Sequence, residues 1–460
     1  MSESLKSLQR TRRATGISWY WYAGACFLFF SGLLVGLTLT RVYPPTRITV
    51  DWNTTHQTID GFGAAVNSDM GTLPPNLMDF FYTTSGAHLS FIRVHLYPDL
   101  ADCEVDDPAH SCVSSKNATI SKSDLANVQA AVARGALVWA AEWSPPGSMK
   151  SNGQYMAGGA FLGGTTNMAN LAFIQASFVT LLSATYNIPI YAISPQNEPD
   201  VSQNYGSCTW TAQQMHDYVP YLVKALASAG YGSTRIMIAE QGTWSNTYST
   251  TAMNDATVAS MIGILASHGY REPATELHWN NFKTQQVWET EVSDFAAYDG
   301  SITSGLAYAT ELHNWLTTAQ VNAWHYWLLS GAAVTDNSGL TDHSNNLAKR
   351  AYTFANFSKF IRPGWQRIDV TNTGPLLVSA YRGPDSKFAI VAINNSRWTA
   401  RNQTFALNGI TSQRSLVTPW LTSASVSLEP RSPVTLTPRG TVLTYTIPAK
   451  SVVTFQGQAD

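Results

Sequence analysis

A short segment in the middle of the chain, residues 191–200 with sequence YAISPQNEPD, places an amide and a carboxylate at the end of a predicted strand. Asn197 and Glu198 stand directly before Pro199, where the chain must turn. In an eight-fold parallel barrel, the carboxyl ends of the strands form the face that carries the active site. We therefore interpret Asn197 and Glu198 as functional residues, although such a pair can also be a capping Asn beside a solvated Glu.

A second carboxylate follows several strands later, in residues 287–293 with sequence VWETEVS. Period-2 alternation puts Glu289 and Glu291 on the same side of a regular strand, so periodicity does not choose between them. Glu291 lies nearer the carboxyl end and is the natural site residue. Glu289 would lie a layer deeper and would need a cationic or hydrogen-bonding partner, or a bulge that redirects it.

Two carboxylates at the mouth of one barrel are what glycoside hydrolysis requires. One stays protonated and donates to the departing oxygen, while the other attacks the anomeric carbon or activates water. The aromatic content, with 15 Trp, 20 Tyr and 18 Phe, suits the apolar faces of neutral sugars. The pattern therefore indicates a carbohydrate-cleaving enzyme.

The charge balance excludes other classes of function. Charged residues make up 13% of the chain, and the formal net charge is −2. A nucleic-acid-binding domain would show clustered basic residues and a high isoelectric point, so we expect no nucleic-acid partner. No Cys-x-x-Cys or His-x-x-x-His spacing occurs, so we expect no zinc site, and the chemistry calls for no cofactor.

Alternating strand and helix signals organise the centre of the chain. Their number and length predict a (β/α)8 barrel, with a doubly wound open sheet as the alternative, because spacing cannot show closure. After about residue 360 the helical signals stop, and short strands separated by turn residues predict a C-terminal β-sandwich. The barrel strands are predicted near 61–66, 90–96, 136–142, 189–194, 235–239, 263–267, 286–291 and 321–327.

The first 40 residues have the pattern of an export signal. Residues 1–16 carry a basic cluster, and residues 17–40 contain no charge over more than the roughly 20 residues that cross a bilayer as a helix. We expect a retained transmembrane signal anchor, with residues 1–16 as a cytoplasmic tail and the catalytic body outside the cytoplasm. A cleaved signal peptide and a secreted body are the alternative. In that compartment a disulfide between Cys103 and Cys112 is plausible.

Seven short motifs complete the sequence picture. Each is weak alone, but their occurrence in order resembles glycoside hydrolase family 30 over about residues 50–457. The motifs are 58–64 (TIDGFGA), 91–95 (FIRVH), 143–150 (WSPPGSMK), 194–199 (SPQNEP), 267–270 (SHGY), 288–291 (WETE) and 357–364 (FSKFIRPG).

The resemblance implies a domain layout and a mechanism. Residues 41–57 would be a linker and a strand that joins the β-sandwich, residues 58–360 the catalytic barrel, and residues 361–460 the β-sandwich. The implied mechanism retains the anomeric configuration through a covalent intermediate. By motif, Glu198 resembles the acid/base and Glu291 the nucleophile.

The resemblance also implies a set of substrate-binding residues. Asn197 would hydrogen-bond the 2-hydroxyl of the sugar under attack. Arg93 and Tyr270 match positions beside the nucleophile, and Trp143 and Trp327 match aromatic walls of the same sugar site. His268 lies beside them.

Several of these residues have structural alternatives. Arg93 could serve only as an ion-pair partner, and Trp327 could be a core residue. His268 is better explained as a hydrogen bonder behind the site than as a proton shuttle. Glu240 could pair with Arg93 or touch substrate, and Glu142 is expected to be structural.

The substrate is less closely defined. The run at 362–367 is similar to the polysaccharide-cleaving branches of the family, but the loop at 328–337 contains no Arg. Glucuronoxylan-specific members use a basic loop there to meet the uronate, so glucuronoxylan is in doubt. We favour an endo-acting β-glycanase of a neutral polysaccharide of the β-1,6-galactan, β-1,6-glucan or xylan type. A glucosylceramidase-like lipid glycosidase and a catalytically silent carbohydrate-binding barrel are the alternatives, and the oligomeric state stays open.

Overall fold

The computed structural model describes residues 46–106, 111–115, 117–270, 272–410, 416–437 and 441–459. These residues belong to one compact unit of the chain, Pro45–Asp460. The cytoplasmic tail and transmembrane segment predicted for residues 1–40 lie outside the described residues, as does the first part of the predicted linker.

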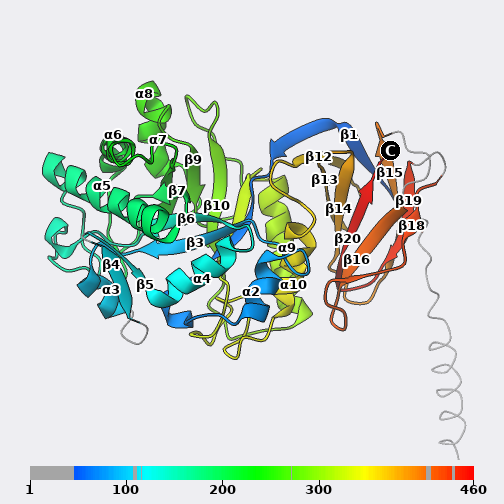
Figure 1. Ribbon diagram of the computed structural model, residues 1–460. Coiled ribbons are helices and arrows are strands. Elements are labelled where there is room, and N and C mark those ends of the chain that lie inside the picture. Colours follow the sequence, from blue (N-terminus) through cyan, green and yellow to red (C-terminus); the bar gives the residue numbers. More distant parts are fainter. Residues whose placement is uncertain are drawn as a thin grey trace, which may run out of the picture. The chain divides into compact units, whose positions relative to one another are not determined.

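Eight parallel strands form a closed barrel, on the left of Figure 1. In barrel order they are β2 (Gly61–Ala65), β3 (Phe91–Leu96), β6 (Leu137–Glu142), β7 (Ile190–Ser194), β8 (Arg235–Gln241), β9 (Ile264–Ser267), β10 (Gln286–Val292) and β11 (Ala323–Leu328). Because β11 pairs in parallel with β2, the sheet has no free edge. The predicted barrel is confirmed, and the open doubly wound sheet is excluded.

Helices surround the barrel strands (Figure 1). Side-chain caps mark where several of them begin; Thr211 and Gln214, for example, form a capping box at the start of α6 (Ala212–Ser228). The other helices are α2 (Pro75–Tyr82), α3 (Leu100–Asp106), α4 (Lys122–Val132), α5 (Gly164–Thr180), α7 (Thr247–Asn254), α8 (Ala256–Ala259), α9 (Ile302–Thr317) and α10 (Lys349–Ser358), with short 3-10 helices at Ser68–Met70 and Gly147–Met149.

Within the described part of the chain, one helical stretch is long and apolar enough to cross a membrane by length and composition. It is Gly164–Thr185, which consists of α5 and a π-helical turn at Leu181–Thr185. Half of its most apolar window is buried inside the protein, as is usual for a core helix. The predicted anchor at residues 17–40 lies outside the described residues.

The C-terminal part of the chain is a mostly-strand domain built on one ten-stranded sheet. Its strands are β12 (Gln366–Thr371), β13 (Leu377–Arg382), β14 (Lys387–Asn394), β15 (Arg401–Asn408), β16 (Leu416–Thr422), β17 (Glu429–Pro430), β18 (Val434–Thr435), β19 (Val442–Ile447) and β20 (Ser451–Gln458), together with β1 (Thr46–Thr58). β1 precedes the barrel in sequence but lies in this sheet, antiparallel to β12 and parallel to β15.

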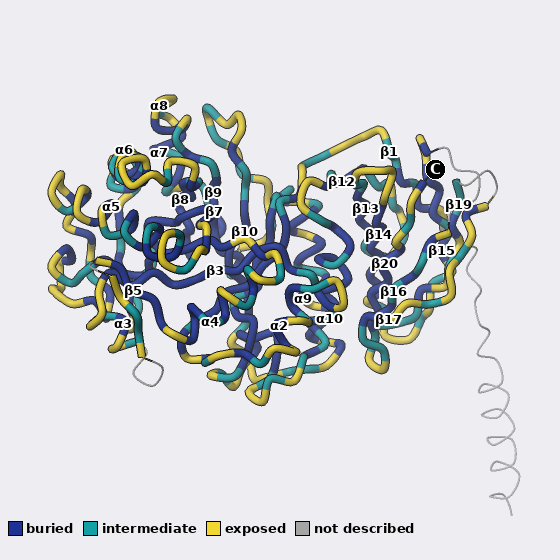
Figure 2. The backbone as a smooth tube through the Cα atoms, viewed as in Figure 1, coloured by how far each residue is buried: buried dark blue, intermediate teal, exposed yellow. Residues whose placement is uncertain are grey.

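The sheet of the C-terminal domain curls around a common apolar core. Phe405 of β15 and Phe455 of β20 are well separated in strand order, yet their ring centroids are 5.2 Å apart. Tyr445 of β19 packs edge-on against the same Phe455 ring at 5.3 Å. Figure 2 shows β14 and β20 as largely buried tube, in contrast to the exposed connecting loops.

The C-terminal domain is joined to the barrel by buried polar contacts. Asn356 on α10 is fully buried, and its amide donates to the Trp420 carbonyl and to Thr454 Oγ1 at 3.1 and 3.0 Å. Thr454 Oγ1 in turn donates to the Asn356 carbonyl at 2.6 Å. These bonds tie a barrel helix to β16 and β20.

Aromatic packing fills the barrel interior below its carboxyl-end face. The rings of Phe91 and Trp288 lie 4.7 Å apart, and Trp139 donates its indole N–H to His325 at 3.2 Å. Gly63 on β2 permits this packing, because a Cβ there would lie 2.5 Å from the His325 ring. A packed aromatic layer therefore lies beneath the carboxyl-end face of the barrel.

Candidate active site

A pocket of about 510 Å³ opens where the barrel strands end, and its size is typical of small-ligand sites. The predicted residues Asn197, Glu198, Glu291, Trp143 and Trp327 all line it. The other lining residues are Val66, Asn67, Asp69, His95, Asp106, Gln203, Tyr205, Gly206, Gly242, Tyr270 and Phe295. Neither Lys nor Arg is among the described residues of the lining, whereas two Asp side chains are.

The turn after β7 aims Glu198 into the pocket. The Asn197 backbone N–H donates to the Glu142 carbonyl at 2.7 Å, and the Glu198 N–H donates to the Glu240 carbonyl at 3.0 Å. Glu198 itself has a positive φ of 44°, a conformation that is uncommon for side chains other than Gly. Contacts to both neighbouring strands therefore hold this turn in place.

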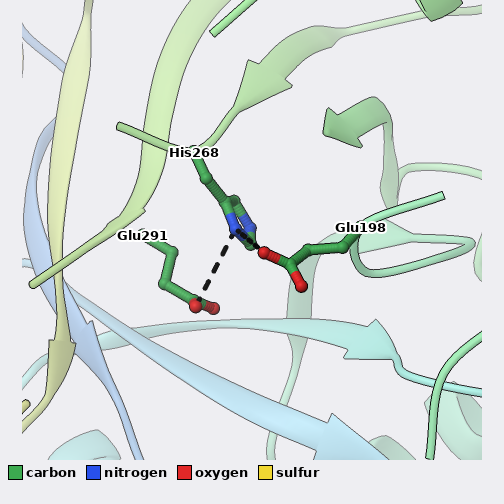
Figure 3. A group of neighbouring side chains, drawn as sticks. All are labelled: Glu198, His268 and Glu291. Carbon is green, nitrogen blue, oxygen red and sulfur yellow. Dashed lines mark hydrogen bonds and ion pairs between the residues drawn. The ribbon is translucent and has the colours of Figure 1, made fainter. Parts of the chain in front are cut away.

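Two donors engage the Glu198 carboxyl. The Tyr205 hydroxyl donates to Oε2 at 3.0 Å, and His268 Nδ1 lies 3.2 Å from Oε1 (Figure 3). Burial alone would raise the pKa of Glu198, but these hydrogen bonds lower it below its usual value. In the free protein Glu198 is therefore held in its ionised form.

Glu291 reaches the pocket because β10 is irregular. The pairing of β10 with β11 shifts register between Glu289 and Val292, which marks a bulge-like irregularity. Glu291 lines the pocket, whereas Glu289 is fully buried and lies outside the pocket lining. A bulge that redirects Glu289 was one of the alternatives that the sequence left open, and the structure places Glu291, and not Glu289, in the pocket lining.

Glu289 takes hydrogen bonds from the backbone instead. The N–H groups of Glu291 and His325 donate to its two oxygens at 3.0 and 3.2 Å. Burial, reinforced by the nearby Glu311 of α9, raises the pKa of Glu289 well above its usual value. Glu289 is thus a neutral, hydrogen-bonded carboxyl turned toward the helix layer.

Arg93 on β3 connects the acidic side chains beneath the pocket. Its guanidinium donates to Glu240 Oε1 at 2.5 Å, to Asn197 Oδ1 at 2.6 Å, and to Glu291 Oε2. Burial alone would lower the pKa of Arg93, but the charges of Glu240 and Glu291 raise it. Arg93 is fully buried and is not among the lining residues, so it lies behind the pocket wall, which fits the alternative of an ion-pair partner.

His268, at the end of β9, lies among three carboxylates. Its Nδ1 is 3.8 Å from Glu291 Oε1, and its Nε2 is 3.5 Å from Glu240 Oε1. Burial alone would lower the pKa of His268, but the surrounding carboxylates, Glu291 first, raise it to about 10. The ring is fully buried and outside the pocket lining, which differs from the predicted substrate contact and fits the alternative of a hydrogen bonder behind the site.

Tyr270 and the two predicted Trp residues complete the wall. The Tyr270 hydroxyl donates to Glu291 Oε1 at 2.8 Å. The Trp143 and Trp327 rings lie 6.1 Å apart, and the Arg93 guanidinium carbon is 4.4 Å from the Trp143 centroid. Trp327 is only partly buried, so it is a wall residue of the pocket and not a fully enclosed core residue.

The cluster in Figure 3 also has a spacing that a cation could bridge. One ligand-type atom each from Glu198, His268 and Glu291 lies within 4.8 Å of the other two. His268 Nδ1 already lies 3.2 Å from Glu198 Oε1, and the raised pKa of His268 favours the protonated ring as the donor in this contact. Arg93 already donates to Glu291. The donor chemistry therefore suits a proton-sharing network better than a metal.

The sequence analysis did not single out several pocket residues, among them Tyr205 and Phe295, which are 41% and 69% exposed. Tyr205 follows Glu198 by seven residues and Phe295 follows Glu291 by four. Aromatic residues in the loops directly after the strands that precede Glu198 and carry Glu291 could therefore have pointed to these two pocket residues. The Phe295 ring stacks on Tyr270 at 5.6 Å.

A disulfide fixes one rim of the pocket. Cys103 on α3 is bonded to Cys112 on β4 (Cys112–Ser115), which pairs with β5 (Ala118–Ser121), as the sequence allowed, and Cys208 is free and buried. Asp106, the last residue of α3, lines the pocket and accepts a hydrogen bond from Tyr97 at 2.8 Å.

A closed parallel barrel with facing carboxylates at the ends of its fourth and seventh strands is the arrangement of a barrel glycoside hydrolase. Residues 59–324 match the family model described as the glycosyl hydrolase family 30 TIM-barrel domain. The chain belongs to glycosyl hydrolase family 30 and is an O-glycosyl hydrolase.

Relatives match almost the whole chain. Glucuronoxylanase XynC of Bacillus subtilis (strain 168) is 28% identical over 452 residues, which cover 94% of this chain and 96% of that protein. The family 30 subfamily 8 xylanase Xyn30A from Clostridium acetobutylicum has a TM-score of 0.77 and 31% identity over 90% of this chain and 100% of its own. A GH30 endoxylanase from Clostridium papyrosolvens C71 has a TM-score of 0.71 and 28% identity, with the same coverage.

Proposed function

We propose that this protein is a retaining, endo-acting β-glycanase of a neutral polysaccharide, with Glu291 as nucleophile and Glu198 as acid/base. The observation that carries this proposal is the spacing of the two carboxyls, because an oxygen of Glu198 lies within 4.8 Å of an oxygen of Glu291. Retaining enzymes hold the two groups about 5–5.5 Å apart, whereas inverting enzymes leave roughly 6.5–9.5 Å for a water.

The contacts of Glu291 suit a nucleophile. Arg93 and Tyr270 donate to different oxygens of its carboxylate, which fixes its orientation toward the pocket. The first step forms a bond from Glu291 to the anomeric carbon as the leaving-group bond breaks. Water then attacks the anomeric carbon from the face opposite Glu291, and the bond to Glu291 breaks. Glu198 accepts the proton of the attacking water.

Asn197 supports the same sugar. Its side-chain carbonyl accepts from Arg93, which leaves the amide N–H₂ for the pocket that Asn197 lines. A hydrogen bond from this amide to the sugar 2-hydroxyl would strengthen as positive charge develops at the anomeric centre. Trp143 and Trp327 would cover the apolar face of the same ring.

The charge of the pocket supports a neutral substrate. Asp69 and Asp106 line it, and the described lining residues include no cation to pair with a uronate. The loop at 328–337, which follows the last barrel strand, also lacks Arg. A carboxylate on the substrate would face like charge, so we favour β-1,6-glucan, β-1,6-galactan or unsubstituted xylan over glucuronoxylan.

A polysaccharide panel tests the proposal. Purified protein is incubated with those three polymers, glucuronoxylan and a glucosyl lipid, and released reducing ends and product lengths are measured. We expect oligosaccharides from one neutral polymer, with Glu291→Gln inactive and the matched control Glu142→Gln active. Preferential cleavage of the lipid would replace the polysaccharide assignment, and binding to a polymer without any cleavage would favour a silent carbohydrate-binding barrel.

We also propose that the catalytic body acts outside the cytoplasm, tethered by residues 17–40 or secreted after their removal. The Cys103–Cys112 disulfide supports this location, because such bonds persist in oxidising compartments. Membrane fractionation and N-terminal sequencing of the native protein distinguish the two forms. Recovery of the intact chain in the cytosol would contradict both.

A further inference from the structure

The Glu198 carboxyl cannot donate a proton in the state that the structure describes. Its Oε1 faces the fully buried His268, and its Oε2 accepts the hydrogen bond of Tyr205. An acid/base residue must point a protonated oxygen at the leaving-group oxygen. Because Oε1 is turned toward the protein interior, Oε2 is the oxygen that has to do so, and Tyr205 occupies that direction.

We propose that Tyr205 is a positioning residue whose hydroxyl stands where the leaving-group oxygen of the substrate binds, so that substrate displaces it from Glu198 and Glu198 takes up a proton on binding. This inference rests on the proposed function of Glu198 and adds a residue to it. The proton enters from solvent at Oε2 and passes to the glycosidic oxygen as that bond breaks. Water returns a proton to Glu198 in the second step, and Glu198 releases this proton to solvent when product leaves and Tyr205 returns, which balances the cycle.

The surroundings of Tyr205 allow its side chain to move while its backbone stays fixed. Tyr205 is 41% exposed, whereas its backbone carbonyl accepts from the Ala157 N–H at 3.1 Å. The next residue, Gly206, packs so closely that a Cβ there would lie 2.6 Å from the Tyr155 ring. Ser207 and Gln203 exchange hydrogen bonds across the same loop at 2.9 and 3.0 Å. A side-chain rotation is therefore the available movement.

The ionisation of Glu198 depends on side chains that surround it at the ends of several neighbouring strands. Burial raises its pKa, while His268, Tyr205 and Arg93 lower it. Of the lowering groups, Tyr205 is the one that substrate can reach, because Arg93 and His268 are fully buried. The titratable and charged groups that face Glu198 are Arg93, Asp200, Tyr205, Glu240, His268, Tyr270 and Glu291.

The Tyr205→Phe variant tests the proposal through the pH dependence of the reaction. kcat/KM reports the free enzyme, in which loss of the hydroxyl removes one hydrogen bond that favours ionised Glu198. The basic limb of the pH profile of kcat/KM should therefore move to higher pH, and kcat/KM on that limb should rise roughly threefold to tenfold. kcat reports the bound state, in which Tyr205 is already displaced, so its basic limb should stay in place. The control Tyr298→Phe removes a hydroxyl from a residue 36% exposed that is not in the pocket lining, and should change neither limb.

Other outcomes of this experiment contradict the proposal. Equal shifts of both limbs would mean that Tyr205 stays on Glu198 in the complex. A uniform loss of rate at all pH values would indicate a purely structural role. Wild-type protein that cleaves no glycan or aryl glycoside would instead overturn the proposed function itself.

A second measurement needs no substitution at Tyr205. An oligosaccharide of the polymer that the enzyme cleaves is titrated into the Glu291→Gln protein, and the binding heat is compared in buffers of different ionisation enthalpy. The proposal predicts net proton uptake on binding at a pH where Glu198 is ionised. Binding heats that do not depend on the buffer would contradict it.

Discussion

The pocket side and the helix-facing side of the barrel each hold a fully buried carboxyl near a strand end, and the pKa values of these two carboxyls are shifted in opposite directions. Glu240, at the end of β8, is fully buried beside Arg93, and burial alone would raise its pKa, but that charge lowers it. Glu142, at the end of β6, is also fully buried, but among the described residues its carboxyl has only the Gln175 amide as partner, at 2.5 Å, and burial raises its pKa well above the usual value. A cationic partner, and not burial alone, decides which carboxyl is charged.

The two Glu residues of β10 likewise differ in their partners. Glu291 receives the guanidinium of Arg93, whereas Glu289 receives only backbone N–H groups and has Glu311 nearby. An irregularity in the strand separates a site carboxylate from a neutral structural one only two residues away. The charged network is therefore confined to the pocket side of the barrel.

Removal of the acid/base should give the largest effect among the substitutions that probe this contrast. Glu198→Ala is expected to lower kcat on polysaccharide by on the order of 10²–10⁴-fold, because the leaving group then departs unprotonated. An aryl glycoside with an acidic leaving group should lose much less in its first step, and added azide should restore its turnover. Equal losses on both substrates, measured by steady-state kinetics, would remove Glu198 from this role.

The paired and the unpaired buried carboxyls should respond differently to the same change. Glu240→Gln takes a charge from the Arg93 cluster, and breaking a buried pair costs roughly 3–5 kcal/mol of unfolding free energy. We also expect activity to fall about 10- to 100-fold, because Arg93 orients Glu291. Glu142→Gln replaces a carboxyl that is already neutral, so stability should change by less than about 1 kcal/mol.

Chemical denaturation and initial rates of both variants check this prediction. The Glu142→Gln protein serves as the control for an isosteric change at a fully buried strand end. Equal losses of unfolding free energy in the two variants would show that the charge of Arg93 does not cause the difference between Glu240 and Glu142.

The neutral carboxyls should also give the stability a pH dependence. Burial raises the pKa of Glu311 from 4.5 to about 7. A raised carboxyl pKa stabilises the folded state fully below the unfolded value, and this contribution is lost as pH rises through the folded value. Between pH 4.5 and 7 the unfolding free energy of wild type should therefore fall more steeply than that of Glu311→Gln. Parallel slopes, measured by denaturation at several pH values, would place the charge change elsewhere.

The smallest expected effect concerns substrate choice. Asp106→Asn removes a negative charge from the pocket lining, so the ratio of activity on glucuronoxylan to activity on unsubstituted xylan should rise by about twofold to fivefold. Glu104→Gln, on the exposed side of the same helix, is the matched control. A ratio that does not change in Asp106→Asn would mean that this charge does not select against uronates.

The sequence predicted the barrel well because its strands are short apolar runs separated by clear helical segments. It did not predict β16, which contains Pro419, a residue that usually argues against a strand. Pro419 is tolerated because its carbonyl still accepts from the Arg431 N–H at 2.8 Å and β16 lies next to the sheet edge. The local sequence pattern therefore did not predict a strand whose formation depends on pairing with its neighbours.

The candidate site could be predicted only in part. The motifs located Glu198 and Glu291, and their catalytic roles stay predictions. The choice between Glu289 and Glu291 depended on a register shift against β11, which a strand's own periodicity does not contain. Tyr205 escaped notice because its contact with Glu198 depends on the path of a loop.

The central claim is that Glu291 forms a covalent bond with the sugar during turnover. A 2-deoxy-2-fluoro glycoside of the sugar that the enzyme cleaves should trap this intermediate, and mass spectrometry of the digested protein should find the added sugar on Glu291. A label on Glu198 or Glu289, or rapid hydrolysis to a product of inverted configuration, would contradict the account.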